Sequence, residues 1–246
     1  MAVFVLVHGG AHGAWCWDKV VPELKRLGHR VVAPDLPGMG QDRTPLSEVS
    51  LGGWATFIAD IARTAGEAVV LVGHSRGGPV ISEAAERAPE AVCGLIYLSA
   101  VMTPAGVSTM DAFAHSTPHL LENSTMTPDG LAFVFDREVA RKCFYHRAAP
   151  EDADAAVKRL CPEPIAPNKE PMTITSGRWG RLPRAYIECT DDRALPLSLQ
   201  RSMHSAVKCD PVLTLDSDHS PFLCAARGLA GRLNTLEEGF ARRPRS

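Results

Sequence analysis

Short apolar runs alternate with longer amphipathic segments along most of this chain. Such alternation is typical of βαβ units, in which parallel strands form a sheet that helices cover on both faces. The runs that we expect to be strands are Val3 to Val7, Arg30 to Ala33, Ala68 to Val72, Val92 to Leu98, Arg184 to Cys189 and Pro211 to Leu215. The segments expected to be helices are Trp17 to Leu27, Leu51 to Thr64, Pro79 to Arg87 and Pro221 to about Glu238. The sequence therefore predicts an α/β fold with a mostly parallel central sheet.

The character of the chain changes between Thr103 and Leu182. Prolines cluster there and strand-like runs disappear, while aromatic and aliphatic residues remain that a small core could bury. We expect an inserted, mainly helical cap over residues 104–181, on a core formed by residues 1–103 and 182–246. Helices are expected within the cap near 130–144 and 153–160. A flexible linker is the alternative interpretation of so many prolines, and the apolar residues argue against it.

Charge and cysteine content exclude several classes of protein. The 246 residues include 26 Lys plus Arg against 28 Asp plus Glu, with no basic run before the last residues, so nucleic acid is not an expected partner. The seven cysteines form no C-x-x-C pair and have no histidine partner at metal spacing, so no metal site is expected. No phosphate-binding loop and no G-x-G-x-x-G follows the first strand, so neither ATP nor a dinucleotide is implied and no cofactor is expected.

No membrane association is expected either. The start lacks the basic segment of a signal peptide, and no stretch approaches the roughly 20 apolar residues that span a bilayer. We therefore expect a soluble cytoplasmic protein with reduced cysteines. The sequence leaves a homodimer open, because it does not report the oligomeric state.

One motif carries a chemical signal. Gly73-His74-Ser75-Arg76-Gly77 reads G-x-S-x-G, follows the third apolar run and opens a helical segment. This pattern places a serine on a sharp turn between a buried strand and a helix, with its hydroxyl exposed. Ser75 is therefore a candidate nucleophile, provided that a base and an acid follow in the right context.

A base and an acid follow in order. His219 lies in a loop between the last expected strand and the final helix, and imidazole can take a hydroxyl proton at neutral pH. Asp191 and Asp192 follow the strand that ends at Cys189, and either could orient the imidazole. The order serine, aspartate, histidine is the one found in α/β-hydrolases.

The reaction also needs donors for a developing oxyanion. His8-Gly9-Gly10-Ala11-His12-Gly13 follows the first strand, and its small residues would let a backbone N–H approach a substrate oxygen. Gly10 is the expected donor from this loop. The second is the backbone N–H of Arg76, directly after the nucleophile at a helix start. His8 and His12 are expected to be structural.

The chain resembles the α/β-hydrolase superfamily, and within it the plant methyl-ester esterase and hydroxynitrile lyase group with its bacterial esterase relatives. The blocks that carry the resemblance run nearly end to end: Leu6 to Trp17, Ala33 to Gly40, Gly73 to Gly78 and Ile187 to Pro196. The resemblance implies an α/β-hydrolase fold with a cap, places the nucleophile and base on Ser75 and His219, and assigns the acid to Asp192. It also places the oxyanion donors on Gly10 and Arg76.

Two departures favour hydrolysis over lyase chemistry. The lyases resemble one another in having a lysine directly after the catalytic histidine, where this chain has Ser220, and a threonine after the first-strand histidine, where it has Gly9. We therefore expect a carboxylesterase-type serine hydrolase that acts through an acyl-enzyme on small or medium apolar or aryl esters. A hydroxynitrile lyase and a non-hydrolysing small-molecule receptor are the alternatives. The residues expected to line the substrate pocket are Met102, Phe113, Leu120, Phe144 and Tyr145.

Overall fold

A computed structural model describes residues 1–113 and 119–242 of the chain. Its main feature is a six-stranded sheet with the strand order β2-β1-β3-β4-β8-β9, in which every neighbouring pair is parallel. The strands are β1 (Val3–Val7), β2 (Arg30–Val32), β3 (Val69–His74), β4 (Val92–Leu98), β8 (Arg184–Cys189) and β9 (Val212–Leu215). The expected α/β fold with a central parallel sheet is confirmed.

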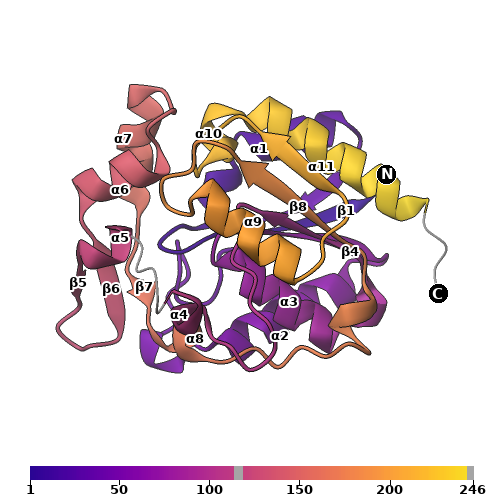
Figure 1. Ribbon diagram of the computed structural model, residues 1–246, viewed down its shortest axis with the longest axis horizontal. Coiled ribbons are helices and arrows are strands. Elements are labelled where there is room, and N and C mark those ends of the chain that lie inside the picture. The colour runs from indigo at the N-terminus through magenta and orange to yellow at the C-terminus, as the bar shows by residue number, and fades with distance from the viewer. Residues whose placement is uncertain (114–118, 243–246) are drawn as a thin grey trace.

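Helices cover both faces of this sheet (Figure 1). One face packs against α1 (Val20–Arg26), α10 (Pro221–Cys224) and α11 (Ala226–Ala241). The other packs against α2 (Leu51–Thr64), α3 (Gly77–Arg87) and α9 (Leu197–Ala206). Short 3₁₀ turns occur at Ala14–Trp17, Leu46–Glu48, Pro89–Ala91 and Trp179–Arg181. Across the described ranges, none of these helices has the length and apolar character that crossing a membrane requires.

Strand periodicity divides the core into two halves. Val3, Val5 and Val7 of β1 belong to the apolar cluster that includes α2 and α3, whereas Phe4 and Leu6 belong to the cluster that includes α1 and α11. Successive side chains of a strand point to opposite faces, so a strand buried on both sides reads as a continuous apolar run. This is why the runs that form β1, β3 and β4 were visible in the sequence.

The chain leaves the sheet after β4 and returns to it at β8. The intervening segment contains α4 (Thr109–Ala112), α5 (His119–Glu122), α6 (Arg137–Phe144), α7 (Pro150–Arg159) and α8 (Ala166–Lys169). It also contains an antiparallel sheet of β5 (Ser124–Met126), β6 (Ala132–Phe135) and β7 (Glu163–Pro164). The elements from α5 to β7 stand together beside the main sheet, at the left of Figure 1. The exact division of the chain at residues 103 and 182 stays a prediction.

The helix expected near 130–144 is wrong in its first half. Residues 132–135 form β6, and Asp136 caps α6 by accepting the backbone N–H of Val139 at 2.9 Å. A side chain that satisfies a free N–H at a helix start favours a boundary at that position. The later helix, expected near 153–160, is α7 and begins earlier, at Pro150, a residue type suited to a first helical position.

Glycine substitutions in two helices test how tightly the layers pack. A Cβ added at Gly78 in α3 would lie 2.1 Å from the carbonyl oxygen of Val101, whereas at Gly231 in α11 it would meet no atom within 4 Å. We expect Gly78→Ala to lower the free energy of unfolding by about 1–3 kcal/mol through overpacking. Gly231→Ala, the control, should raise it by about 0.5–1 kcal/mol through helix propensity. Urea unfolding measures both, and equal effects would contradict this packing.

Candidate active site

The candidate nucleophile lies on a sharp turn between β3 and α3. Ser75 has φ +53°, a left-handed conformation that costs a non-glycine residue energy, and its N–H donates to the carbonyl oxygen of Leu98 at 3.2 Å. Glycines make this turn possible. An added Cβ would lie 2.6 Å from Gly77 O at Gly73, and 2.8 Å from Val7 O at Gly77. The motif therefore reflects close backbone approach on both sides of Ser75.

A buried histidine and carboxylate lie next to this turn. His219 Nδ1 donates to Asp192 Oδ2 at 2.7 Å, and the two side chains are 2% and 0% exposed. The Ser99 hydroxyl also donates to Asp192 Oδ2. The other carboxylate oxygen accepts the backbone N–H groups of Ala194 and Leu195 at 2.8 and 2.7 Å. These bonds fix the carboxylate and, through it, the orientation of the imidazole.

The two aspartates that follow β8 differ in solvent exposure. Asp191 is exposed and pairs with His146 Nε2 at 3.0 Å, whereas Asp192 points inward to His219. The neighbours of His219 in sequence have other partners. Asp216 pairs with Arg147 on the surface, and the buried Asp218 accepts the backbone N–H of Arg147 at 2.8 Å. Sequence reasoning from the residues alone could not make this distinction, because both aspartates follow the same strand.

The glycine-rich loop after β1 approaches the nucleophile closely. A Cβ added at Gly9 would lie 2.9 Å from both Ser75 Cβ and His74 Nδ1, so a larger residue would displace this contact. His8 Nδ1 donates to Gly9 O at 2.9 Å, and its Nε2 accepts the Leu36 N–H at 3.1 Å. The loop is therefore anchored by a histidine that bonds to backbone groups on both sides.

Three buried histidines are neutral partners of backbone groups around the site. Burial, with a contribution from the Arg76 charge, lowers the pKa of His8 to about 3, and burial lowers the pKa of His12 to about 3. Burial, with His219 nearby, also holds the pKa of His74 well below its usual value. His74 Nε2 donates to the carbonyl oxygen of His219 at 2.8 Å. These rings act as fixed hydrogen-bonding groups that shape the loops.

A cavity of about 520 Å³ opens beside these residues. Ser75, His219, Gly10 and Arg76 all contribute to its wall, so the structure brings four of the residues predicted from the sequence to one place. Asp192 lies behind His219 rather than in the wall. The rest of the lining is mostly apolar: Val101, Thr109, Met110, Asp111, Phe113, Leu120, Leu121, Ser124, Phe133, Phe135, Phe144, Glu163, Asn168, Ala194 and Leu195.

Three of the five expected pocket residues line this cavity and two do not. Phe113, Leu120 and Phe144 are in its wall. Met102 is instead part of the core beneath it, where its Sδ lies 3.7 Å from Cys209 Sγ. Tyr145 is buried, and its hydroxyl donates to His12 Nε2 at 2.7 Å, so its polar end is directed to the glycine-rich loop. A buried tyrosine needs such a partner, which the sequence could not indicate.

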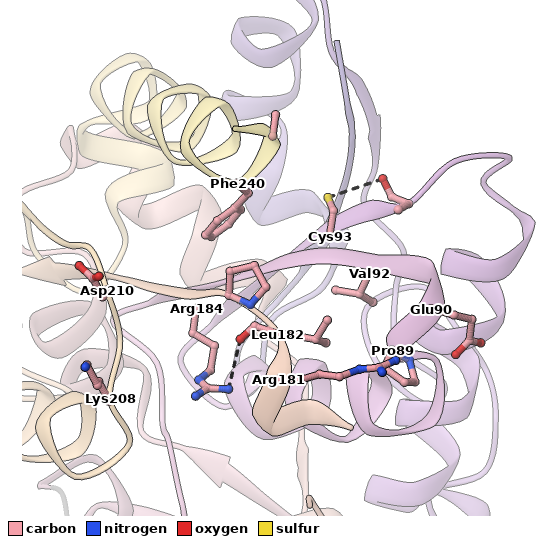
Figure 2. A pocket seen from close by; sticks show the side chains of 13 residues that line it. Pro89, Glu90, Val92, Cys93, Arg181, Leu182, Arg184, Lys208, Asp210 and Phe240 are labelled. Atoms are coloured by element: carbon pink, nitrogen blue, oxygen red, sulfur yellow. Dashed lines mark hydrogen bonds between the residues drawn. The ribbon is translucent and has the colours of Figure 1, made fainter. Parts of the chain in front are cut away.

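A second cavity, of about 640 Å³, lies at the opposite end of the sheet. Figure 2 shows it near the first residues of β4 and β8, where Arg184 donates to the carbonyl oxygen of Leu182. Although this cavity is larger, it lies at the amino ends of the strands. Its wall contains none of the candidate catalytic residues Gly10, Ser75, Arg76, Asp192 and His219. Ligands of open parallel sheets bind at the carboxyl ends, so the smaller cavity is the candidate active site.

Comparisons with known proteins match most of this chain. The family model described as "Alpha/beta hydrolase family" matches residues 4–232. The chain belongs to the alpha/beta hydrolase family. This alpha/beta hydrolase is 31% identical over 255 residues to Methylesterase 1 of Arabidopsis thaliana, with 96% of each chain covered. The structure is also similar to the crystal structure of a pyrethroid hydrolase from Sphingobium faniae JZ-2, with a TM-score of 0.87, 31% identity and coverage of 98% and 99%.

Some curated relatives are longer than this alpha/beta hydrolase. It is 31% identical over 240 residues to "Putative methylesterase 11, chloroplastic" of Arabidopsis thaliana, which covers 92% of this chain. The chain spans 61% of the length of that relative. The match therefore establishes the family of the shared region.

The buried histidines predict how stability depends on pH. The unfolded chain binds protons at histidine near pH 6.5, whereas folding holds the pKa of His8 and His12 at about 3. The unfolded state therefore binds more protons between these values, so the free energy of unfolding should fall as the pH drops below 6.5. Between pH 7.5 and pH 5 we expect each of the two residues to contribute a loss of roughly 2 kcal/mol.

Urea unfolding at the two pH values measures this loss. His12→Asn is the comparison variant, since asparagine does not titrate. Between pH 7.5 and pH 5 its free energy of unfolding should fall by about 2 kcal/mol less than that of the parent. The same loss in both proteins would show that His12 is not responsible.

Proposed function

We propose that this protein is a serine-dependent carboxylic ester hydrolase that acts through an acyl-enzyme. The observation that carries the proposal is that Ser75 and His219 line one cavity, while Asp192 accepts the Nδ1–H of His219 at 2.7 Å behind them. A carboxylate at Nδ1 leaves Nε2 as the basic nitrogen of the imidazole. Family membership and relatives named as esterases or hydrolases support the same reaction class.

In the acylation step, His219 Nε2 removes the hydroxyl proton of Ser75 as Oγ attacks the ester carbonyl carbon. The carbonyl oxygen becomes an oxyanion, which the backbone N–H groups of Gly10 and Arg76 stabilise. Asp192 stabilises the imidazolium formed in this step. When the tetrahedral intermediate collapses, the bond to the alkoxy oxygen breaks and His219 returns the proton to the departing alcohol.

Deacylation repeats these steps with water as the nucleophile. His219 takes a proton from water as its oxygen attacks the acyl carbon, and the same two N–H groups hold the second oxyanion. The bond to Ser75 Oγ then breaks, and His219 gives the proton to the serine. The products are a carboxylic acid and an alcohol, and no cofactor takes part in this scheme.

The cavity wall supports small or medium apolar or aryl esters as substrates. Aromatic and aliphatic side chains dominate the wall, and a volume of about 520 Å³ is in the range of small-molecule sites. The names of the relatives, a methylesterase and a pyrethroid hydrolase, support an ester as the substrate. The elements from α5 to β7 form a lobe that is inserted between β4 and β8. We propose that this lobe, which supplies Phe133, Phe135 and Phe144, selects the apolar part of the substrate.

Two positions argue against hydroxynitrile lyase chemistry. At Gly9, where the lyases carry threonine, an added Cβ would lie 2.9 Å from Ser75 Cβ. Ser220, where they carry lysine, is fully buried and does not line the cavity, so it offers no cation to a departing cyanide. Hydrolysis is therefore the reaction that we favour.

Ser75→Ala and Asp192→Asn test the proposed mechanism. Removal of the nucleophile should lower kcat for p-nitrophenyl acetate by at least about 10⁴-fold. Asp192→Asn should lower it by about 10⁴-fold, because an amide favours the wrong imidazole tautomer. Circular dichroism should show unchanged secondary structure in both variants. Activity that survives in folded Ser75→Ala would sink the mechanism.

Covalent labelling and a substrate panel separate the alternatives. A fluorophosphonate should label the peptide that contains Ser75, and this label should be lost in Ser75→Ala. Esters and lactones should be hydrolysed, and mandelonitrile should release no cyanide. Cyanide release with negligible ester turnover would favour a lyase, whereas ligand binding without labelling would favour a receptor.

Phe133→Ala tests which surface selects the substrate. Phe133 lines the cavity from β6, and the next residue, Val134, is exposed on the other side of that strand. Enlarging the cavity should raise kcat/KM for p-nitrophenyl naphthoate, which has a bulky acyl group, relative to kcat/KM for p-nitrophenyl acetate by about tenfold. Val134→Ala removes apolar atoms from the same strand and should leave this ratio unchanged. An unchanged ratio in Phe133→Ala would exclude β6 from substrate selection.

A further inference from the structure

A buried ion pair joins the lobe to the residue after the nucleophile. Glu163, the first residue of β7, accepts the Nε–H of Arg76 at 2.8 Å, and the two side chains are 6% and 7% exposed. The Arg76 guanidinium also lies over the Trp54 ring, 4.1 Å from its centroid. Asn168 Nδ2 donates to the same Glu163 oxygen at 2.9 Å. The carboxylate is therefore held from two sides at the cavity wall.

The other oxygen of Glu163 holds the peptide that follows Gly10. Its Oε2 accepts the Ala11 N–H at 2.7 Å, and His12 Nδ1 donates to the carbonyl oxygen of Gly10 at 2.6 Å. Both polar atoms of the Gly10–Ala11 peptide therefore have fixed partners. Ala11 has φ +58°, a conformation that a non-glycine residue keeps only when its surroundings impose it.

The Arg76 side chain holds the peptide that precedes Gly10. Its Nη2 donates to the carbonyl oxygen of Gly9 at 3.2 Å, and His8 Nδ1 donates to the same oxygen at 2.9 Å. Because a trans peptide is planar, fixing this carbonyl also fixes the Gly10 N–H on its opposite side. Glu163 therefore reaches both peptides that flank the Gly10 Cα, one directly and one through Arg76.

We propose that Glu163 is a positioning residue for the oxyanion site. The inference rests on the proposed function, in which the N–H groups of Gly10 and Arg76 stabilise the oxyanion. The carboxylate holds the Ala11 N–H and the Arg76 guanidinium, and thereby aligns the Gly10 N–H with the donor that Arg76 supplies from its own backbone. A contact of the lobe thus sets the geometry of a catalytic group in the core.

Charge makes this role specific to a carboxylate. All three of these partners of Glu163 are donors: the Ala11 N–H, the Arg76 guanidinium and the Asn168 amide. The site therefore requires an acceptor at each carboxylate oxygen. Glutamine keeps the shape but turns one acceptor into a donor, which then faces another donor. It also leaves the buried Arg76 charge without a counter-ion, which is unfavourable away from water.

Glu163→Gln is the test, with Glu83→Gln as the matched control. Glu83 in α3 is 3% exposed, pairs with Arg87 and accepts the backbone N–H of Thr173, so it makes the same kinds of bond outside the cavity wall. Both variants should lower Tm. Glu163→Gln should lower kcat for p-nitrophenyl acetate by about 10- to 100-fold, less than the loss of a whole donor. Glu83→Gln should leave kcat unchanged.

Binding of a transition-state analogue distinguishes positioning from a general structural effect. A trifluoromethyl ketone forms a tetrahedral oxyanion adduct with an active-site serine, so its inhibition constant should rise by about the same factor as kcat falls. KM should change by less than about threefold, because the ground-state ester does not depend on aligned donors. A folded Glu163→Gln enzyme with kcat and inhibition constant within about twofold of the parent would overturn the inference.

A double variant covers the case in which Glu163→Gln does not fold. Arg76→Leu with Glu163→Leu removes both charges, and apolar replacement of a buried pair often preserves stability. The backbone N–H of Arg76 stays in place, but the Gly9 carbonyl and the Ala11 N–H each lose a partner. We expect kcat to fall by at least about tenfold. A folded double variant with the activity of the parent would also overturn the inference.

Ser75→Ala separates this inference from the function on which it rests. If folded Ser75→Ala remains active, the proposed function fails and the inference fails with it. If Ser75→Ala is inactive and Glu163→Gln has full kcat, only the role of Glu163 is refuted.

Discussion

The close approach of three backbone segments around Ser75 is the constraint on which the rest of the site depends. Gly77 packs against the end of β1, Gly78 against Val101 beyond β4, and Gly9 against the Ser75 side chain. Neighbouring parallel strands bring these segments to one edge of the sheet, and the absence of Cβ atoms lets them touch. The strained φ of Ser75 is imposed by its surroundings, since its N–H donates to Leu98 O and its carbonyl oxygen accepts the N–H groups of Gly78 and Val101.

Sequence reasoning succeeded where local pattern decides structure. The central strands β1, β3 and β4 were visible because strands buried on both faces are continuously apolar. The edge strands β2 and β9 are partly exposed and were recognised from shorter apolar runs. It failed in the lobe, where Ala132-Phe133-Val134-Phe135 is too short for periodicity to separate a strand from a helix. The order of serine, aspartate and histidine was readable, but the inward orientation of Asp192 is a tertiary feature, and only the resemblance to a family indicated it.

Groups that support the site gave little signal in the sequence. Ser99 directly follows β4 and Gln200 is in α9, yet both contact Asp192. Glu163 is 87 residues from Arg76. A buried glutamate between two prolines reads as an exposed loop residue, because its partners lie far away in sequence. Tyr145 shows the opposite error, since an aromatic residue near the expected pocket proved to be a hydrogen-bonding partner of His12.

The pairing of β4 with β8 has a consequence for how such proteins can diverge. These strands are hydrogen-bonded neighbours, although the whole lobe lies between them in the chain. The entropy cost of closing a loop grows only with the logarithm of its length, so this connection can lengthen or be rebuilt at little cost to the sheet. Under the proposed role of the lobe in substrate selection, substrate preference can evolve by exchange of one insertion, provided that the new insertion still supplies a counter-ion for Arg76.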